Sequence, residues 1–118
     1  MTNRRGLIVA IIVAVVIVGA GFVALRNAGG GGQERAFAVT VSGNRMAPQT
    51  ITVKQNDSVT LTVTVDRDEE IHLHGYDLKH EIKAGGSATY QFKADKSGNF
   101  DIEIEDSSTT IGHLVVNQ

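Results

Sequence analysis

Cysteine and tryptophan are absent from this 118-residue chain, and proline occurs once. Without cysteine the chain can form no disulfide, thiolate metal site, iron–sulfur cluster or cysteine nucleophile. A basic patch is also missing, since residues 33–118 carry eight basic against thirteen acidic side chains, a net charge of about −5 with histidine neutral. Nucleic acid is therefore not an expected partner, and an acidic surface weakly favours cations.

One long uncharged hydrophobic run, residues 7–25, reads LIVAIIVAVVIVGAGFVAL. As a helix it would extend roughly 28 Å, close to the hydrocarbon thickness of a bilayer. Arg4 and Arg5 precede the run and only Arg26 follows closely. The positive-inside rule then predicts a cytoplasmic N-terminus over residues 1–6 and a single-pass transmembrane helix. The rest of the chain is predicted to be extracytoplasmic, either periplasmic or extracellular.

A cleaved signal peptide is the alternative interpretation, because Val18-Gly19-Ala20 offers small residues at a suitable spacing. The apolar run continues to Leu25, however, and the hydrophobic region of a signal peptide is usually shorter. Both interpretations export the domain that follows. A glycine-rich linker is predicted over residues 26–35 and the domain over residues 36–118, with folded structure starting near Glu34 to Ala38.

Alternation of apolar and polar residues with period two dominates after the linker. The clearest case is residues 59–65, where Val or Leu alternates with Thr. Turn signals separate such runs every eight to twelve residues or so, which is the spacing of a sandwich or barrel. The pattern predicts an all-β sandwich of seven or eight strands, with runs at 37–42, 51–54, 59–65, 71–74, 90–93, 100–105 and 111–116.

Four histidines lie in the predicted domain: His72, His74, His80 and His113. His72 and His74 are two residues apart, so a strand would place both rings on one face. Neutral imidazole is a good ligand for Cu(II), Zn(II) and Ni(II), and His113, Glu105 and His80 are candidates to complete a site. The competing interpretation is the polar outer face of a strand whose inner residues are Ile71 and Leu73.

Three segments resemble cupredoxin-like domains over roughly residues 37–117. Residues 46–65, MAPQTITVKQNDSVTLTVTV, resemble the opening half, with Asn56 in the place of the usual turn glycine. Asparagine tolerates the left-handed backbone conformation, so this exchange is physically mild. EIHLHGYDL, residues 70–78, resembles the His-x-His-Gly-Tyr-Asp stretch of exported cupredoxin-like proteins that lack a blue-copper site. Residues 85–116 resemble the closing half.

This resemblance implies a Greek-key cupredoxin-like sandwich and a copper site that is not blue. Blue-copper proteins use a late cysteine, whose position corresponds to Ile104, and a type 1 site needs thiolate. Relatives often carry histidine where this chain has Glu105, but a carboxylate can also ligate copper or zinc. The candidate metal ligands are therefore His72 and His74, with Glu105 or His113 completing the site.

Two functions from different classes follow. The first is a membrane-tethered extracytoplasmic module that binds copper for storage, delivery or sensing. The alternative is a metal-free scaffold that presents its loops to an envelope protein. An enzyme is not expected, because the sequence shows no nucleophile–base pair at a meaningful spacing, no phosphate loop and no carboxylate pair set against an apolar strand.

Overall fold

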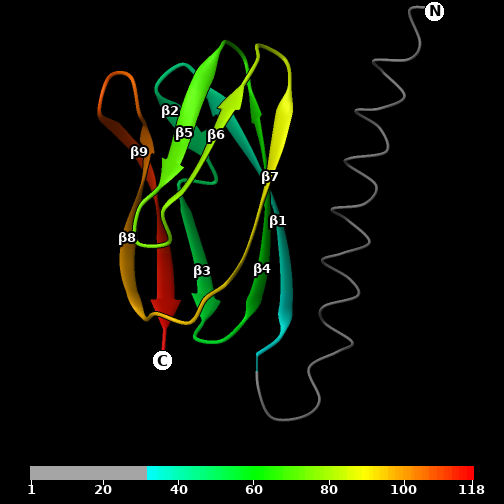
Figure 1. Cartoon of the computed structure of the whole chain (residues 1–118), viewed down its shortest axis with the longest axis vertical. Coiled ribbons are helices and arrows are strands. Elements are labelled where there is room, and N and C mark those ends of the chain that lie inside the picture. Colours follow the sequence, from blue (N-terminus) through cyan, green and yellow to red (C-terminus); the bar gives the residue numbers. More distant parts are fainter. Residues whose placement is uncertain (1–31) are drawn as a thin grey trace, which may run out of the picture.

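The computed structural model describes residues 32–118, which form two β-sheets packed face to face (Figure 1). One sheet has four strands in the order β2-β1-β4-β7, and the other has five in the order β3-β9-β8-β5-β6. The strands are β1 (Glu34–Ser42), β2 (Arg45–Ala47), β3 (Thr50–Lys54), β4 (Ser58–Val65), β5 (Glu69–Leu73), β6 (Leu78–Ile82), β7 (Ser87–Lys93), β8 (Gly98–Ile104) and β9 (Thr109–Asn117). The all-β sandwich is thus confirmed.

Period-two alternation produces the core between the sheets. In β4 each Val or Leu is buried and each intervening Thr is partly exposed. The inner faces of the other strands add the remaining core side chains, including Ile71, Leu73, Ile102 and Leu114. Because both sheets bury alternate residues against each other, the polar residues in between are left on the two outer faces.

Strand pairing is mixed, with β1–β4 and β3–β9 parallel and the other neighbours antiparallel. The β8–β9 register shifts between Ile102 and Glu103, so one extra β9 residue is accommodated there. Ile111 and Gly112 are consecutive and both buried, as expected at such a bulge.

The predicted number of strands, seven or eight, was too low, because the described residues form nine. The two strands that the alternation did not reveal are β2 and β6. β2 has only three residues, too few to show a period. β6 lies at a sheet edge, where three successive residues are exposed and the two-residue period is lost.

Other predictions concern the ends and turns of the domain. The expected transmembrane run 7–25 lies outside the described residues, and within residues 32–118 no helix is long and apolar enough to cross a membrane. The first strand begins at Glu34. Asn56 has a φ of 74°, the left-handed conformation that its place in the turn required.

Candidate metal centre

The outer face of the five-stranded sheet carries the histidines and acids singled out in the sequence. Ile71 and Leu73 of β5 point into the core, so His72 and His74 point outward. On the neighbouring β8, Ile102 and Ile104 are buried, which leaves Glu103 outward. Register then places Glu103 directly opposite His72. One sheet face therefore presents imidazoles beside a carboxylate.

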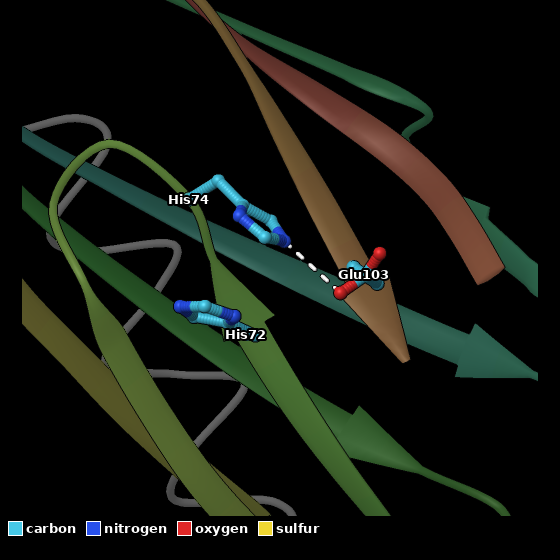
Figure 2. Close-up of side chains that lie close together, drawn as sticks. All are labelled: His72, His74 and Glu103. Atoms are coloured by element: carbon cyan, nitrogen blue, oxygen red, sulfur yellow. Dashed lines mark hydrogen bonds and ion pairs between the residues drawn. The ribbon is translucent and has the colours of Figure 1, made fainter. Parts of the chain in front are cut away.

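His72, His74 and Glu103 form a compact group (Figure 2). One candidate ligand atom from each lies within 4.8 Å of the other two. His74 Nε2 lies 3.0 Å from Glu103 Oε1, and the two imidazole ring centroids are 4.1 Å apart. The side chain of His72 is 13% exposed and that of His74 is 43% exposed, so the group is open to solvent on the His74 side.

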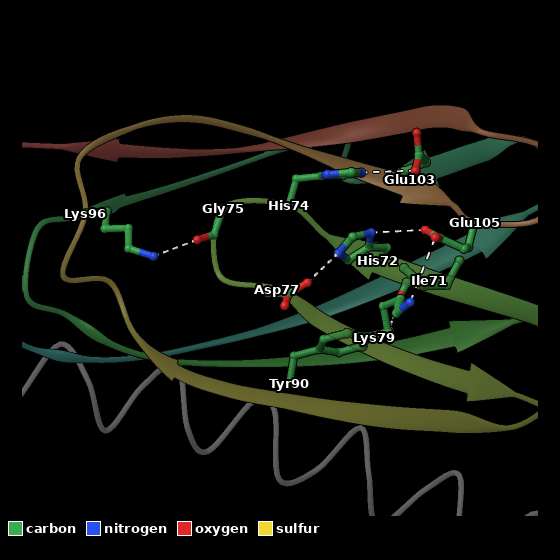
Figure 3. A network of polar contacts seen from close by, with 10 residues as sticks. All are labelled: Ile71, His72, His74, Gly75, Asp77, Lys79, Tyr90, Lys96, Glu103 and Glu105. Atoms are coloured by element: carbon green, nitrogen blue, oxygen red, sulfur yellow. Dashed lines mark hydrogen bonds and ion pairs between the residues drawn. The ribbon is translucent and has the colours of Figure 1, made fainter.

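Two further carboxylates flank His72 (Figure 3). Glu105 Oε2 lies 3.0 Å from His72 Nδ1, and Asp77 Oδ1 lies 3.3 Å from His72 Nε2. Lys79 is the cross-strand neighbour of His72 on β6, and its Nζ lies 3.9 Å from Glu105 Oε1. The surroundings of the histidine pair are thus mainly anionic, a field that favours a cation.

The turn that follows β5 fixes the position of His74. The His74 amide donates to the Asp101 carbonyl at 3.0 Å. Tyr76 packs on the rings of Phe92 and Phe100 and donates its hydroxyl to the Lys96 carbonyl at 2.7 Å. Burial raises the pKa of Tyr76, so the hydroxyl stays protonated and able to donate.

The other two predicted ligand candidates lie apart from the His72–His74–Glu103 group. His113 on β9 faces Asp101 of β8, with His113 Nε2 3.3 Å from Asp101 Oδ1. His80 lies on β6, where its ring makes an edge contact with Tyr90 at a centroid distance of 4.6 Å. The structure therefore brings Glu105 to His72 and leaves His113 and His80 with other partners.

Glu103 is the site residue that the sequence interpretation missed. A signal for it was present, because the alternation of Phe100, Ile102 and Ile104 leaves Asp101, Glu103 and Glu105 on the opposite face. The sequence could not choose among these three acids, because the choice depends on which residue of β8 lies opposite His72. That register is a long-range property of the β5–β8 pair.

The donor atoms and their spacing fit a divalent metal ion of intermediate hardness, such as copper or zinc. Imidazole nitrogen and carboxylate oxygen bind zinc at about 2.0–2.2 Å, so ligand atoms on one ion lie at most about 4.4 Å apart. The candidate ligand atoms lie within 4.8 Å of one another, so the widest pair must approach by at most about 0.4 Å to reach this range. Bound there, copper or zinc would be cargo or a structural ion, held by His72, His74 and Glu103.

The comparisons with known proteins agree with the fold. A family model described as a cupredoxin-like domain matches residues 8–116. No curated protein matches the chain. Among solved structures, a copper binding protein in its apo form is 18% identical, with a TM-score of 0.59, over 77% of this chain and 93% of that chain.

Two further structural relatives belong to different classes of protein, a metal-transporting ATPase and an oxidase. The metal-binding domain of the Streptococcus pneumoniae D39 Cu(I)-exporting P-type ATPase CopA, solved with Cu(I), is 12% identical, with a TM-score of 0.63 over 78% of this chain and 92% of that chain. A multicopper oxidase, mgLAC, is 25% identical, with a TM-score of 0.58 over 71% of this chain and 39% of that chain. Such domains thus occur in binding proteins and within larger enzymes.

Proposed function

The chain belongs to the cupredoxin-like domain family, and we propose that it binds copper through imidazole and carboxylate ligands outside a membrane, as a metal-handling module. The observation that carries this proposal is the convergence of His72, His74 and Glu103 within 4.8 Å. Glu105, at the position where exported relatives often carry histidine, lies with its Oε2 3.0 Å from His72 Nδ1 and is a candidate for a further carboxylate ligand. The copper-binding descriptions of two structural relatives support the choice of metal.

The tethered, extracytoplasmic location in this proposal rests on residues 7–25 and their flanking arginines. Enzymatic turnover is not part of it. This chain spans 39% of the multicopper oxidase that it resembles, and no cysteine is available for the type 1 site of a blue-copper centre. Binding and transfer of an ion need only ligands that solvent can reach, and the group is open to solvent on the His74 side.

Replacing both His72 and His74 with alanine tests the site. We expect the full chain, purified in detergent and stripped with a chelator, to bind one Cu(II) with nitrogen hyperfine structure in its EPR spectrum. The double variant should lose at least about 100-fold in affinity, because two of the ligands are removed. Calorimetric titration measures the loss, and circular dichroism checks that the fold is intact.

Matched variants separate the carboxylates from the distant histidine. Glu103→Gln should weaken Cu(II) binding about 10-fold or more, whereas His113→Ala should leave it nearly unchanged. Unaltered affinity in the double histidine variant would contradict the assignment of the site.

A metal-free scaffold is the second candidate, and one observation favours it. Each outward histidine of this face already has a carboxylate partner: Glu105 and Asp77 for His72, Glu103 for His74, and Asp101 for His113. The polar network is therefore closed without an ion. If the full chain binds neither Cu(II) nor Cu(I) at micromolar concentration, the scaffold function replaces the first, and crosslinking in membranes is the way to find an envelope partner.

A further inference from the structure

The donor atoms at the metal centre are all nitrogen or oxygen. The side chains that meet around His72 are an imidazole, His74, and three carboxylates, Asp77, Glu103 and Glu105. Sulfur is missing from this face of the described domain. The chain has no cysteine and two methionines, of which Met1 precedes the described residues.

The other methionine, Met46, cannot serve this centre. It lies on β2 of the four-stranded sheet and is only 6% exposed, within the core. Its side chain packs against Gly112 so closely that a Cβ at that glycine would collide with the methionine Sδ at 2.9 Å. The thioether is therefore held between the sheets, whereas the histidine pair is on the outer face of the other sheet.

Donor type decides which oxidation state of copper a site prefers. Cu(I) is soft and is selected by thiolate and thioether ligands, whereas imidazole and carboxylate suit the divalent ion. Charge acts in the same direction, because Glu103 and Glu105 together offset the charge of a divalent ion, with Lys79 3.9 Å from Glu105 as a partial counter-charge. Both effects favour Cu(II) over Cu(I), and Cu(II) also stands above Zn(II) in the general affinity order.

We infer that this centre is selective for the cupric ion: it holds Cu(II) and gives up the metal when a one-electron donor reduces it to Cu(I). The inference rests on the proposed function and specifies its substrate. It also separates this chain from the CopA domain of the same fold, which was solved with Cu(I). The fold is common to both proteins, so the ligands on it must decide the oxidation state.

The experiment compares both ions on the full chain in detergent. Cu(II) affinity is measured in competition with a nitrogen–carboxylate chelator, and Cu(I) affinity without oxygen, with ascorbate present, in competition with bathocuproine disulfonate. We expect Cu(I) to bind at least about 100-fold more weakly than Cu(II). At 59 mV for each tenfold ratio, this lowers the copper potential by about 120 mV relative to the free couple.

A substitution that adds a sulfur ligand tests the inference by an expected gain of Cu(I) affinity. Glu103→Met places a thioether where the carboxylate was, with a side chain of similar length. It should raise Cu(I) affinity at least about tenfold while lowering Cu(II) affinity. Glu103→Gln, the matched control, should lower Cu(II) affinity without any gain for Cu(I).

The outcomes separate the inference from the function on which it rests. Failure of the wild-type chain to bind either ion removes the proposed function, and the inference with it. Cu(I) binding as tight as Cu(II) binding, retained in Met46→Leu, overturns the inference alone and leaves copper handling in place. Cu(II) selectivity that Glu103→Met reverses or narrows supports it.

Discussion

At the scale of single residues, Tyr90 makes a buried hydrogen bond within the core. Its side chain is 2% exposed, and its hydroxyl donates to the Ile71 carbonyl at 2.7 Å, directly before His72 in the chain. Burial raises the pKa of Tyr90 well above its ordinary value of 10.0, with the nearby charge of Glu70 acting in the same direction. The neutral phenol is therefore the form that the fold requires.

This shift predicts a loss of stability at alkaline pH. The pKa of Tyr90 is higher in the folded than in the unfolded state. The stabilisation of the fold by the neutral phenol is therefore complete below pH 10.0 and is lost as the pH rises above that value. Tyr90→Phe should lower the free energy of unfolding by about 1–2 kcal/mol at neutral pH, since the Ile71 carbonyl loses its donor. Denaturant unfolding at neutral pH and above pH 10.0 measures both effects. A variant with the same alkaline loss as wild type would contradict the role of Tyr90.

At the scale of elements, the turn between β5 and β6 carries His74 of the metal centre and packs against Phe100 of the domain. Gly75 has a φ of +84°, and a Cβ there would collide with the Phe100 ring. Its carbonyl accepts a hydrogen bond from Lys96 Nζ at 2.8 Å. The turn therefore needs glycine for two reasons, its backbone conformation and the close approach of an aromatic side chain.

Gly75→Ala should destabilise the domain and weaken copper binding together, because the displaced turn carries His74. We expect a loss of about 2–4 kcal/mol, from the left-handed conformation and from overpacking against Phe100. Gly85→Ala is the matched control, because Gly85 has a φ of +77° but nothing lies within 4 Å of its Cβ position. That variant should lose only about 1–2 kcal/mol and keep its copper affinity. Thermal unfolding measures the loss of stability in each variant. Equal losses in Gly75→Ala and Gly85→Ala would contradict a clash between a Cβ at position 75 and Phe100.

At the scale of the whole molecule, Asp57 joins the start of the domain to the turn before β4. It is the one buried charged side chain of the described residues, 2% exposed. It accepts hydrogen bonds from the amides of Gln33 and Lys54, both at 2.9 Å, and its Oδ2 lies 3.9 Å from Arg35 Nη1. The turn at Asn56 and Asp57, which resembles that of cupredoxin-like domains, thus holds the start of the first strand in place through the Asp57 side chain.

Asp57→Ala should therefore cost about 3 kcal/mol or more in unfolding free energy, because two charge-assisted, part-buried hydrogen bonds are lost. Asp106→Ala, at an exposed position, should change it by no more than about 0.5 kcal/mol. Denaturant midpoints give the comparison. Similar midpoints for the two variants would show that Asp57 does not hold the strand.

The predicted membrane tether also belongs to this scale. If residues 7–25 anchor the chain, alkaline carbonate washing of membranes should leave it in the pellet, because a transmembrane helix is held by the hydrophobic effect and not by charge. Release into the supernatant, at a mass reduced by the hydrophobic run, would indicate the cleaved signal peptide instead.

The sequence by itself determined the all-β class and the inner and outer faces of most strands, because side-chain direction follows a local period of two. It also excluded a thiolate copper site by composition and placed His72 and His74 on one face. Tertiary structure alone decided that β2 and β6 exist as strands and that Glu103 faces His72, while His113 faces Asp101. Those features depend on which strands pair and in which register, and register is set by contacts between residues far apart in the chain.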